Sequence, residues 1–160
     1  MKQMTLSLIF LRRNDQVLLA MKKRGFGEGR WNGAGGKVEP GETLEQSMIR
    51  EAEEEIGITP IAYEKVGDIV FDEYFKGEPT LLRVHVFTAT KWQGTPQESD
   101  EMRPQWFALD RIPYDSMWPD DPLWLPRVLA GKKITATFTL DETDTIIFHN
   151  VREIVDVSSD

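Results

Sequence analysis

The sequence of 160 residues contains no cysteine, which excludes a disulfide framework and thiol chemistry. It has no apolar stretch close to the roughly 18–20 residues that a membrane span needs, and its N-terminus lacks the features of a signal peptide. Positive charge is scarce, since 19 Lys and Arg against 27 Asp and Glu leave a net charge of −8. A nucleic-acid polymer and an anionic membrane surface are therefore poor partners. We expect a monomeric, cytoplasmic protein that binds a small molecule.

The length suits a single domain over residues 1–160. A helix is predicted from Leu44 to Ile56, and a shorter one at 122–129, where Pro126 is unfavourable. Runs of β-branched and aromatic residues predict strands at 4–11, 17–21, 61–71, 79–92 and 105–109, and a closing hairpin at 134–140 and 145–148. This mixture predicts an α+β fold, an α/β/α sandwich around a mixed β-sheet.

The helix at 44–56 has clear start and stop signals. Thr43 is suited to the N-cap, Gln46 to the capping-box position and Gly57 to the C-terminal stop. Its apolar residues recur every four positions and form one stripe: Leu44, Met48, Ala52 and Ile56.

Carboxylates crowd the end of this helix, in REAEEEIG at residues 50–57. At about 100° per residue, Glu51, Glu54 and Glu55 converge on one face beside the apolar stripe, while Glu53 points away and should be exposed. One interpretation is a solvated acidic face. However, like charges at this spacing, at the negative end of the helix dipole, are unfavourable and indicate a bound cation. Oxygen ligands without a nearby His or Cys favour Mg²⁺ or Mn²⁺ over zinc.

The segment before the helix, residues 22–42, contains seven glycines and is expected to be a loop. Gly33, Gly35, Gly36 and Gly41 allow tight turns and close approach to a ligand. The same segment supplies several basic residues: Lys22, Lys23, Arg24, Arg30 and Lys37. Together with the carboxylate cluster, they indicate a bound polyphosphate.

The acidic run also belongs to a longer pattern. Gly36, five residues, Glu42, seven residues and then REAEEEIGI at 50–58 fill every fixed position of a 23-residue signature. On these residues the chain resembles the Nudix hydrolases. Flanking segments at 21–33, 93–107 and 117–121 are similar to the branch of that family that acts on oxidised purine nucleoside triphosphates, and the likeness extends from about residue 4 to 157.

The resemblance implies a Nudix-type sandwich fold and an enzyme that depends on Mg²⁺. Its substrates would be oxidised purine nucleoside triphosphates such as 8-oxo-dGTP and 2-oxo-dATP. Water would attack the β-phosphorus and release the monophosphate and pyrophosphate, which would remove damaged purines from the nucleotide pool.

The resemblance also implies roles for particular residues. Arg50 would orient the carboxylates of the signature, with Glu42 as its structural partner. The implied metal ligands are the Gly35 carbonyl, Glu51, Glu54, Glu55 and Glu101. Which of these four acids activates the water is left open. The implied substrate-binding residues are Ser7, Lys22, Phe26, Asn32, Gly36, Lys37, Phe71, Leu82, Trp118, Asp120, Asp121 and Trp124.

Trp118-Pro119-Asp120-Asp121 is the segment that we expect to recognise the base. Trp118 offers a stacking face, and adjacent carboxylates can accept N–H groups from a base edge. In a dry pocket the two carboxylates repel, so one pKa should rise and one proton should be kept. A carboxyl group that can donate or accept would fit more than one oxidised purine. The other interpretation is a turn followed by a helix N-cap.

Other functions stay open. The same chemistry could act on ADP-ribose or a methylated purine triphosphate, and a non-catalytic nucleotide-sensing module is a further alternative, although the acids of the signature are all retained. Ser7 and Leu82 stand where the oxidised-purine branch has threonine and methionine, and residues 72–76 form a slightly longer segment. For Phe26, Phe71 and Trp124, ordinary core packing is the other interpretation.

Overall fold

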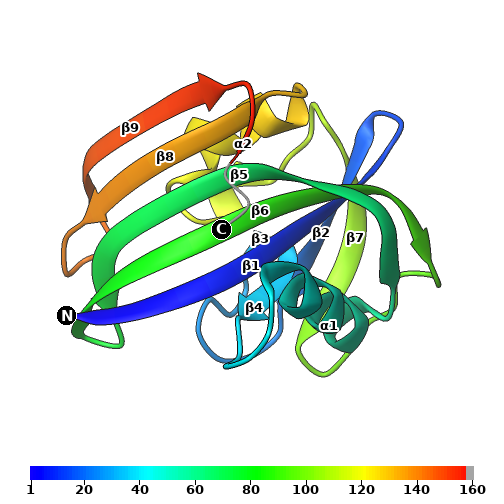
Figure 1. Ribbon diagram of the computed structural model, residues 1–160, viewed down its shortest axis with the longest axis horizontal. Coiled ribbons are helices and arrows are strands. Elements are labelled where there is room, and N and C mark those ends of the chain that lie inside the picture. Colours follow the sequence, from blue (N-terminus) through cyan, green and yellow to red (C-terminus); the bar gives the residue numbers. More distant parts are fainter. Residues whose placement is uncertain (158–160) are drawn as a thin grey trace.

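The computed structural model describes residues 1–157, so the last three positions of the predicted domain, 158–160, lie outside the described residues. Figure 1 shows the arrangement of the helices and strands. In chain order these are β1 (Lys2–Arg13), β2 (Gln16–Lys22), β3 (Trp31–Asn32), β4 (Ala34–Lys37), α1 (Leu44–Ile56), β5 (Thr59–Phe75), β6 (Glu78–Gln93), β7 (Met102–Ala108), the 3₁₀ helix η1 (Tyr114–Ser116), α2 (Asp121–Leu129), β8 (Lys133–Leu140) and β9 (Ile146–Ile154).

The sheet is mixed, as predicted. Its strands run in the order β3-β2-β1-β6-β5-β8-β9, while β4 pairs with β1 and β7 pairs with β2. The β1–β6 and β5–β8 pairs are parallel, and the other pairs are antiparallel. In Figure 1 the long strands β1, β6, β5, β8 and β9 curve side by side.

The two faces of the sheet carry separate hydrophobic cores, because successive side chains of a strand point to opposite faces. On β1, Phe10 packs into the core that contains Trp124 and Leu125 of α2. Its neighbours Ile9 and Leu11 pack into the core that contains Met48, Ala52 and Ile56 of α1. Figure 1 accordingly shows α2 behind β5 and β8, and α1 beside β4. The predicted α/β/α sandwich is therefore confirmed.

Helix α1 has the predicted boundaries. The Thr43 side chain accepts a hydrogen bond from the backbone N–H of Gln46, and the Gln46 side chain accepts one from the backbone N–H of Thr43, so the capping box is complete. Gly57 ends the helix in the left-handed conformation, with φ of 71°. Local signals were sufficient here because each cap bond spans only a few residues.

The strands differ from the sequence-based expectation at several ends, with β1, β7 and β9 longer than predicted, and two further differences bear on the site. Residues 22–42, expected to be a loop, contain the short strands β3 and β4, whose pairing with β2 and β1 comes from distant parts of the chain. Strand β5 continues past the predicted end at Phe71 to Phe75, because β6 pairs with it up to a two-residue turn. The turn residues Lys76 and Gly77 both have positive φ, 52° and 78°, as a tight hairpin turn requires.

Candidate active site

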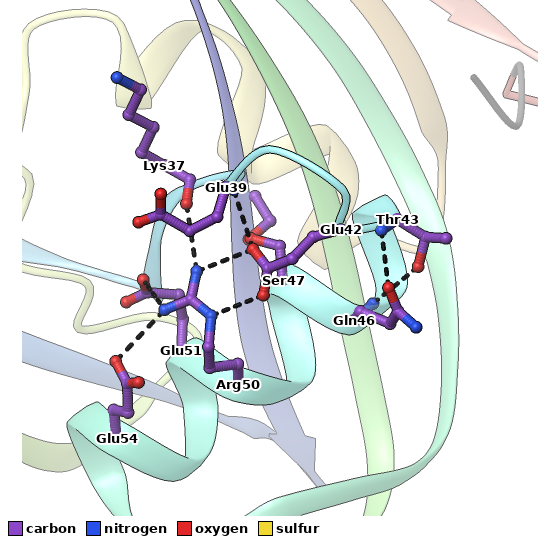
Figure 2. Close-up of polar contacts among 10 residues, drawn as sticks. Lys37, Glu39, Glu42, Thr43, Gln46, Ser47, Arg50, Glu51 and Glu54 are labelled. Atoms are coloured by element: carbon purple, nitrogen blue, oxygen red, sulfur yellow. Dashed lines mark hydrogen bonds and ion pairs between the residues drawn. The ribbon is translucent and has the colours of Figure 1, made fainter.

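Arg50 is the centre of a polar network that joins the two halves of the predicted signature (Figure 2). Its guanidinium group makes two hydrogen bonds to Glu42, from Nε at 2.6 Å and from Nη2 at 3.0 Å. Nη1 donates to Glu51 at 2.8 Å and to Glu54 at 3.3 Å, and Nη2 also donates to the Lys37 carbonyl at 3.3 Å. The hydrogen bonds from Arg50 lower the pKa of Glu42 to about 2. One arginine thus links β4, the following loop and α1.

The three convergent acids of α1 lie in different environments. Glu55 is 7% exposed and accepts a hydrogen bond from the backbone N–H of Gly35 at 2.8 Å. Burial raises its pKa to about 7, and burial also raises the pKa of Glu51. The Glu54 side chain is 60% exposed. Glu53 is exposed, as predicted.

The glycines of β4 allow the strand to approach the helix acids and β1 closely. A Cβ atom at Gly36 would lie 2.7–2.8 Å from the carboxylate atoms of Glu51, and one at Gly35 would lie 2.0 Å from the Ser7 carbonyl oxygen. Both contacts are shorter than real Cβ contacts, so a larger residue at either position would displace its neighbour. At Gly35 and Gly36 the close approach is therefore between the backbone of β4 and the protein's own residues, Ser7 and Glu51. The predicted approach to a ligand stays a prediction.

Glu101 is held by basic side chains. Its Oε2 accepts a hydrogen bond from Lys22 at 3.1 Å, and its Oε1 accepts bonds from Nε and Nη2 of Arg24 at 3.2 and 3.1 Å. These bonds, that of Lys22 first, lower the pKa of Glu101.

The donor chemistry of the predicted metal ligands fits a hard divalent cation, because it consists of three carboxylates on one helix face, Glu101 and a backbone carbonyl. Within residues 1–157, however, no three such side chains stand close enough together to hold a metal ion. Arg50 instead forms ion pairs with Glu51 and Glu54, and Lys22 and Arg24 form ion pairs with Glu101. The metal-binding set therefore stays a prediction.

A cavity of about 380 Å³ lies beside these acids, between the sheet and the N-terminal end of α2. All the predicted substrate-binding residues line it, although they come from well-separated parts of the chain: Ser7, Lys22, Phe26, Asn32, Gly36, Lys37, Phe71, Leu82, Trp118, Asp120, Asp121 and Trp124. Gly35 and Glu55 also line it, and Glu51, Glu54, Glu101 and Arg50 do not. The structure thus brings the predicted residues to one place, and their roles stay predictions.

Asp120 and Asp121 are buried side by side at the start of α2, with 5% and 2% of their surface exposed. Asp120 accepts a hydrogen bond from the indole N–H of Trp124 at 2.8 Å, and Asp121 accepts one from the backbone N–H of Trp118 at 3.1 Å. Burial raises the pKa of Asp120 to about 6. It also raises that of Asp121 well above its usual range, and the charge of Asp120 raises it further. Asp120 stands at the N-cap position, as the alternative interpretation expected, but its side chain bonds to Trp124 and makes no capping bond.

The ring of Trp118 is in contact with two other side chains. Phe26, itself 51% exposed, stacks on it with a centroid separation of 5.1 Å, and the guanidinium of Arg30 lies 4.4 Å from the ring centre. A purine that stacks on Trp118 must therefore share this ring with these side chains or displace one of them.

The chain matches the family model described as the NUDIX domain over residues 1–128. The chain belongs to the Nudix family. Members of this family typically depend on a divalent metal ion. Within residues 1–157, no helix is both long and apolar enough to cross a membrane.

Among similar Nudix proteins, the mouse (Mus musculus) oxidized purine nucleoside triphosphate hydrolase is 49% identical over 148 residues, which cover 92% of this chain and 94% of the mouse protein. The zebrafish (Danio rerio) protein of the same name is 48% identical over 152 residues, which cover 95% and 96% of the two chains. Among solved structures, the mutator MutT protein from Bacillus halodurans superposes with a TM-score of 0.81 at 26% identity, covering 92% of this chain and 97% of that one.

Several cavity residues outside the 23-residue signature were not predicted as ligand-binding residues. Glu73 and Phe75 extend the cavity wall along β5, and Met102 also lines the cavity. Of the basic residues predicted near a polyphosphate, Lys22, Arg30 and Lys37 line the cavity, whereas Lys23 and Arg24 do not. Residues two apart on a strand share one face, so Glu73 and Phe75, two and four residues after Phe71, lie on the same face as Phe71. This pattern could have identified them, but the prediction ended the strand at Phe71.

The raised pKa of Asp120 has a consequence for stability. The unfolded-state pKa of an aspartate is about 3.9, and the folded-state value here is about 6. As the pH rises, the unfolded chain releases this proton first, so the folded state loses stability between about pH 4 and pH 6.

We expect Asp120→Asn, which keeps an oxygen for Trp124, to reduce this loss. Chemical denaturation across this pH range measures it, with Asp110→Asn at an exposed position as the control; parallel pH profiles for wild type and Asp120→Asn would contradict the expectation.

Proposed function

We propose that the chain is a Mg²⁺-dependent nucleoside triphosphate pyrophosphohydrolase that acts on oxidised purines such as 8-oxo-dGTP and 2-oxo-dATP, and that it removes them from the nucleotide pool. The observation that carries the proposal is one continuous cavity, whose lining includes the buried Asp120–Asp121 pair as well as Gly35, Gly36 and Glu55. It supplies a site for a base at one end and a site for phosphates and metal at the other. The mouse and zebrafish relatives named above support the same assignment.

Basic residues suit the phosphate end. Lys22 and Lys37 line the cavity near Gly36 and provide positive charge in a chain of net charge −8. Glu51, Glu54, Glu55, Glu101 and the Gly35 carbonyl are the proposed metal ligands. Mg²⁺, when bound, neutralises phosphate charge and acidifies a water molecule. Arg50 fixes the side chains of Glu51 and Glu54 through its hydrogen bonds and is a positioning residue.

Glu55 is the acid that we assign to accept the proton of the attacking water. Of the four candidate acids, it lines the cavity, whereas Glu51, Glu54 and Glu101 do not. Its hydrogen bond from Gly35 fixes the carboxylate in place, so that it can accept a proton in a defined position.

Asp120 and Asp121 are proposed to read the base. With one carboxyl group ionised and its neighbour protonated, the pair presents an acceptor beside a donor. Such a pair fits purines with different patterns of N–H and C=O groups, which suits more than one oxidised base. Asn32 and Trp118 complete the proposed base site.

A panel of substrates tests the proposed function. Pyrophosphate release is measured with Mg²⁺ for 8-oxo-dGTP, 2-oxo-dATP, dGTP, dATP, a methylated purine triphosphate and ADP-ribose. We expect kcat/KM for 8-oxo-dGTP to exceed that for dGTP by tenfold or more, about 1.4 kcal/mol. A preference below about threefold, near 0.6 kcal/mol, is evidence against the sanitising role. Tight nucleotide binding without turnover would instead identify a sensing module.

The assignment of Glu55 predicts a large loss of rate. We expect Glu55→Gln to lower kcat by roughly 10²-fold or more, because the amide cannot accept the proton. The matched control is Glu53→Gln, since Glu53 lies on the same helix and is exposed. Equal rates for the two variants would exclude Glu55 from the chemistry.

The assignment of Asp120 and Asp121 predicts a change of preference. Asp120→Asn and Asp121→Asn should alter the ratio of kcat/KM for 8-oxo-dGTP and 2-oxo-dATP, because an amide cannot exchange donor for acceptor by protonation. Glu55→Gln should lower both values together. Unchanged ratios in both aspartate variants would refute base reading by this pair.

A further inference from the structure

The cavity wall on β5 contains one acid within an apolar row. Ile69, Phe71, Glu73 and Phe75 alternate along the strand, so they share one face, and all four line the cavity. The rings on either side of Glu73 are themselves packed: Phe71 stacks on Phe138 at 5.4 Å, and Phe75 meets Phe26 edge to face at 4.9 Å. The Glu73 carboxyl group therefore stands in a fixed apolar wall.

Glu73 has no protein partner that compensates for this position. Within the described residues, no hydrogen bond or ion pair is recorded for its carboxyl group, whereas Arg30 donates to the Met117 carbonyl and Lys22 pairs with Glu101. Burial raises the pKa of Glu73 to about 7, and the charges of Asp120 and Asp144 raise it further. The other charged groups that line the cavity are Lys22, Arg30, Lys37, Glu55 and Asp121.

The Glu73 side chain is half-buried, and its place among phenylalanines disfavours the charged carboxylate. A ligand that brings an N–H group to this wall can donate a hydrogen bond to that carboxyl group. The position also faces the same cavity as the Asp120–Asp121 pair, which places a third carboxyl group around the proposed base site.

We propose that Glu73 is a specificity-determining residue, which hydrogen-bonds an N–H group of the bound purine that the Asp120–Asp121 pair leaves unpaired. The proposal rests on the function proposed above and extends it to a second recognition point. Its ligand class is a purine with N–H groups on more than one edge. An 8-oxopurine meets this requirement, because its N7 carries a hydrogen, whereas N7 of an ordinary purine is an acceptor.

Kinetics of two variants test this assignment. Glu73→Leu continues the apolar row and removes the bond, and Glu73→Gln keeps a hydrogen-bonding group that does not titrate. We expect Glu73→Leu to raise KM for 8-oxo-dGTP about tenfold, with kcat changed by less than about twofold and a smaller effect on dGTP. Glu73→Gln should restore KM to within about threefold of wild type and flatten its dependence on pH between about 6 and 8. The control is Asp72→Asn, a neighbouring carboxylate that is exposed and does not line the cavity.

The outcomes separate the two proposals. If wild type acts on 8-oxo-dGTP and Glu73→Leu keeps the wild-type KM, or lowers it, the role of Glu73 is refuted and the proposed function stands. If wild type neither hydrolyses nor binds any purine nucleotide of the panel, the proposed function itself has failed.

Calorimetric titration with 8-oxo-dGMP measures the affinity of the base site without turnover. Weaker binding by Glu73→Leu supports the assignment, and equal binding overturns it. If Glu73→Leu does not fold, the pH profile of Glu73→Gln decides, and a profile that parallels wild type contradicts the proposal.

Discussion

The bonds of Arg50 to Glu42 and to the helix acids are the interaction on which the site depends. Helix α1 carries its carboxylates at spacings where they repel, and it carries them at the helix end where the dipole disfavours them. The planar guanidinium group meets two of these acids, Glu51 and Glu54, together with Glu42 from the preceding loop, and it also reaches the Lys37 carbonyl (Figure 2). A lysine, which carries its charge on one nitrogen at the end of a flexible chain, cannot make this set of hydrogen bonds. The same side chain thus balances the charge and fixes β4 against the helix.

The cavity beside this network has a charge distribution that suits a nucleotide. Lys37 directly follows Gly35 and Gly36, and Lys22 lies near Glu55. Asp120 lies near Glu73, and Arg30 lies near the aspartate pair and over the ring of Trp118. The lysine end suits an anionic chain of phosphates, and the end with three carboxyl groups suits a ring with N–H groups, so these charges favour one orientation of a nucleotide.

Local patterns in the sequence were sufficient for α1, because its capping box, its glycine stop and its apolar stripe all operate within a few residues. The positions of the cavity residues came from the family resemblance, since Ser7 and Asp120 are far apart in sequence and no periodicity relates them. Strands β3 and β4 were missed because their existence depends on pairing with β2 and β1 rather than on propensity. Glu73 was missed for a similar reason, because only the pairing with β6 extends β5 past Phe71.

Glu101 illustrates a different limit. The family resemblance placed it with the helix acids, but its side chain is bonded to Lys22 and Arg24. A carboxylate with several cationic neighbours has competing partners, and the choice among them depends on the total charge present, which includes any bound metal and phosphate.

The lack of a side chain at Gly36 determines how closely β4 can approach helix α1. Because the backbone of β4 lies directly against the Glu51 carboxylate, a side chain at Gly36 would displace that carboxylate. Glu73, Phe75 and Asp121 line the cavity from other elements, β5 and α2. We therefore expect substitutions at those positions to change the fit of a ligand while the contact between β4 and α1 stays in place.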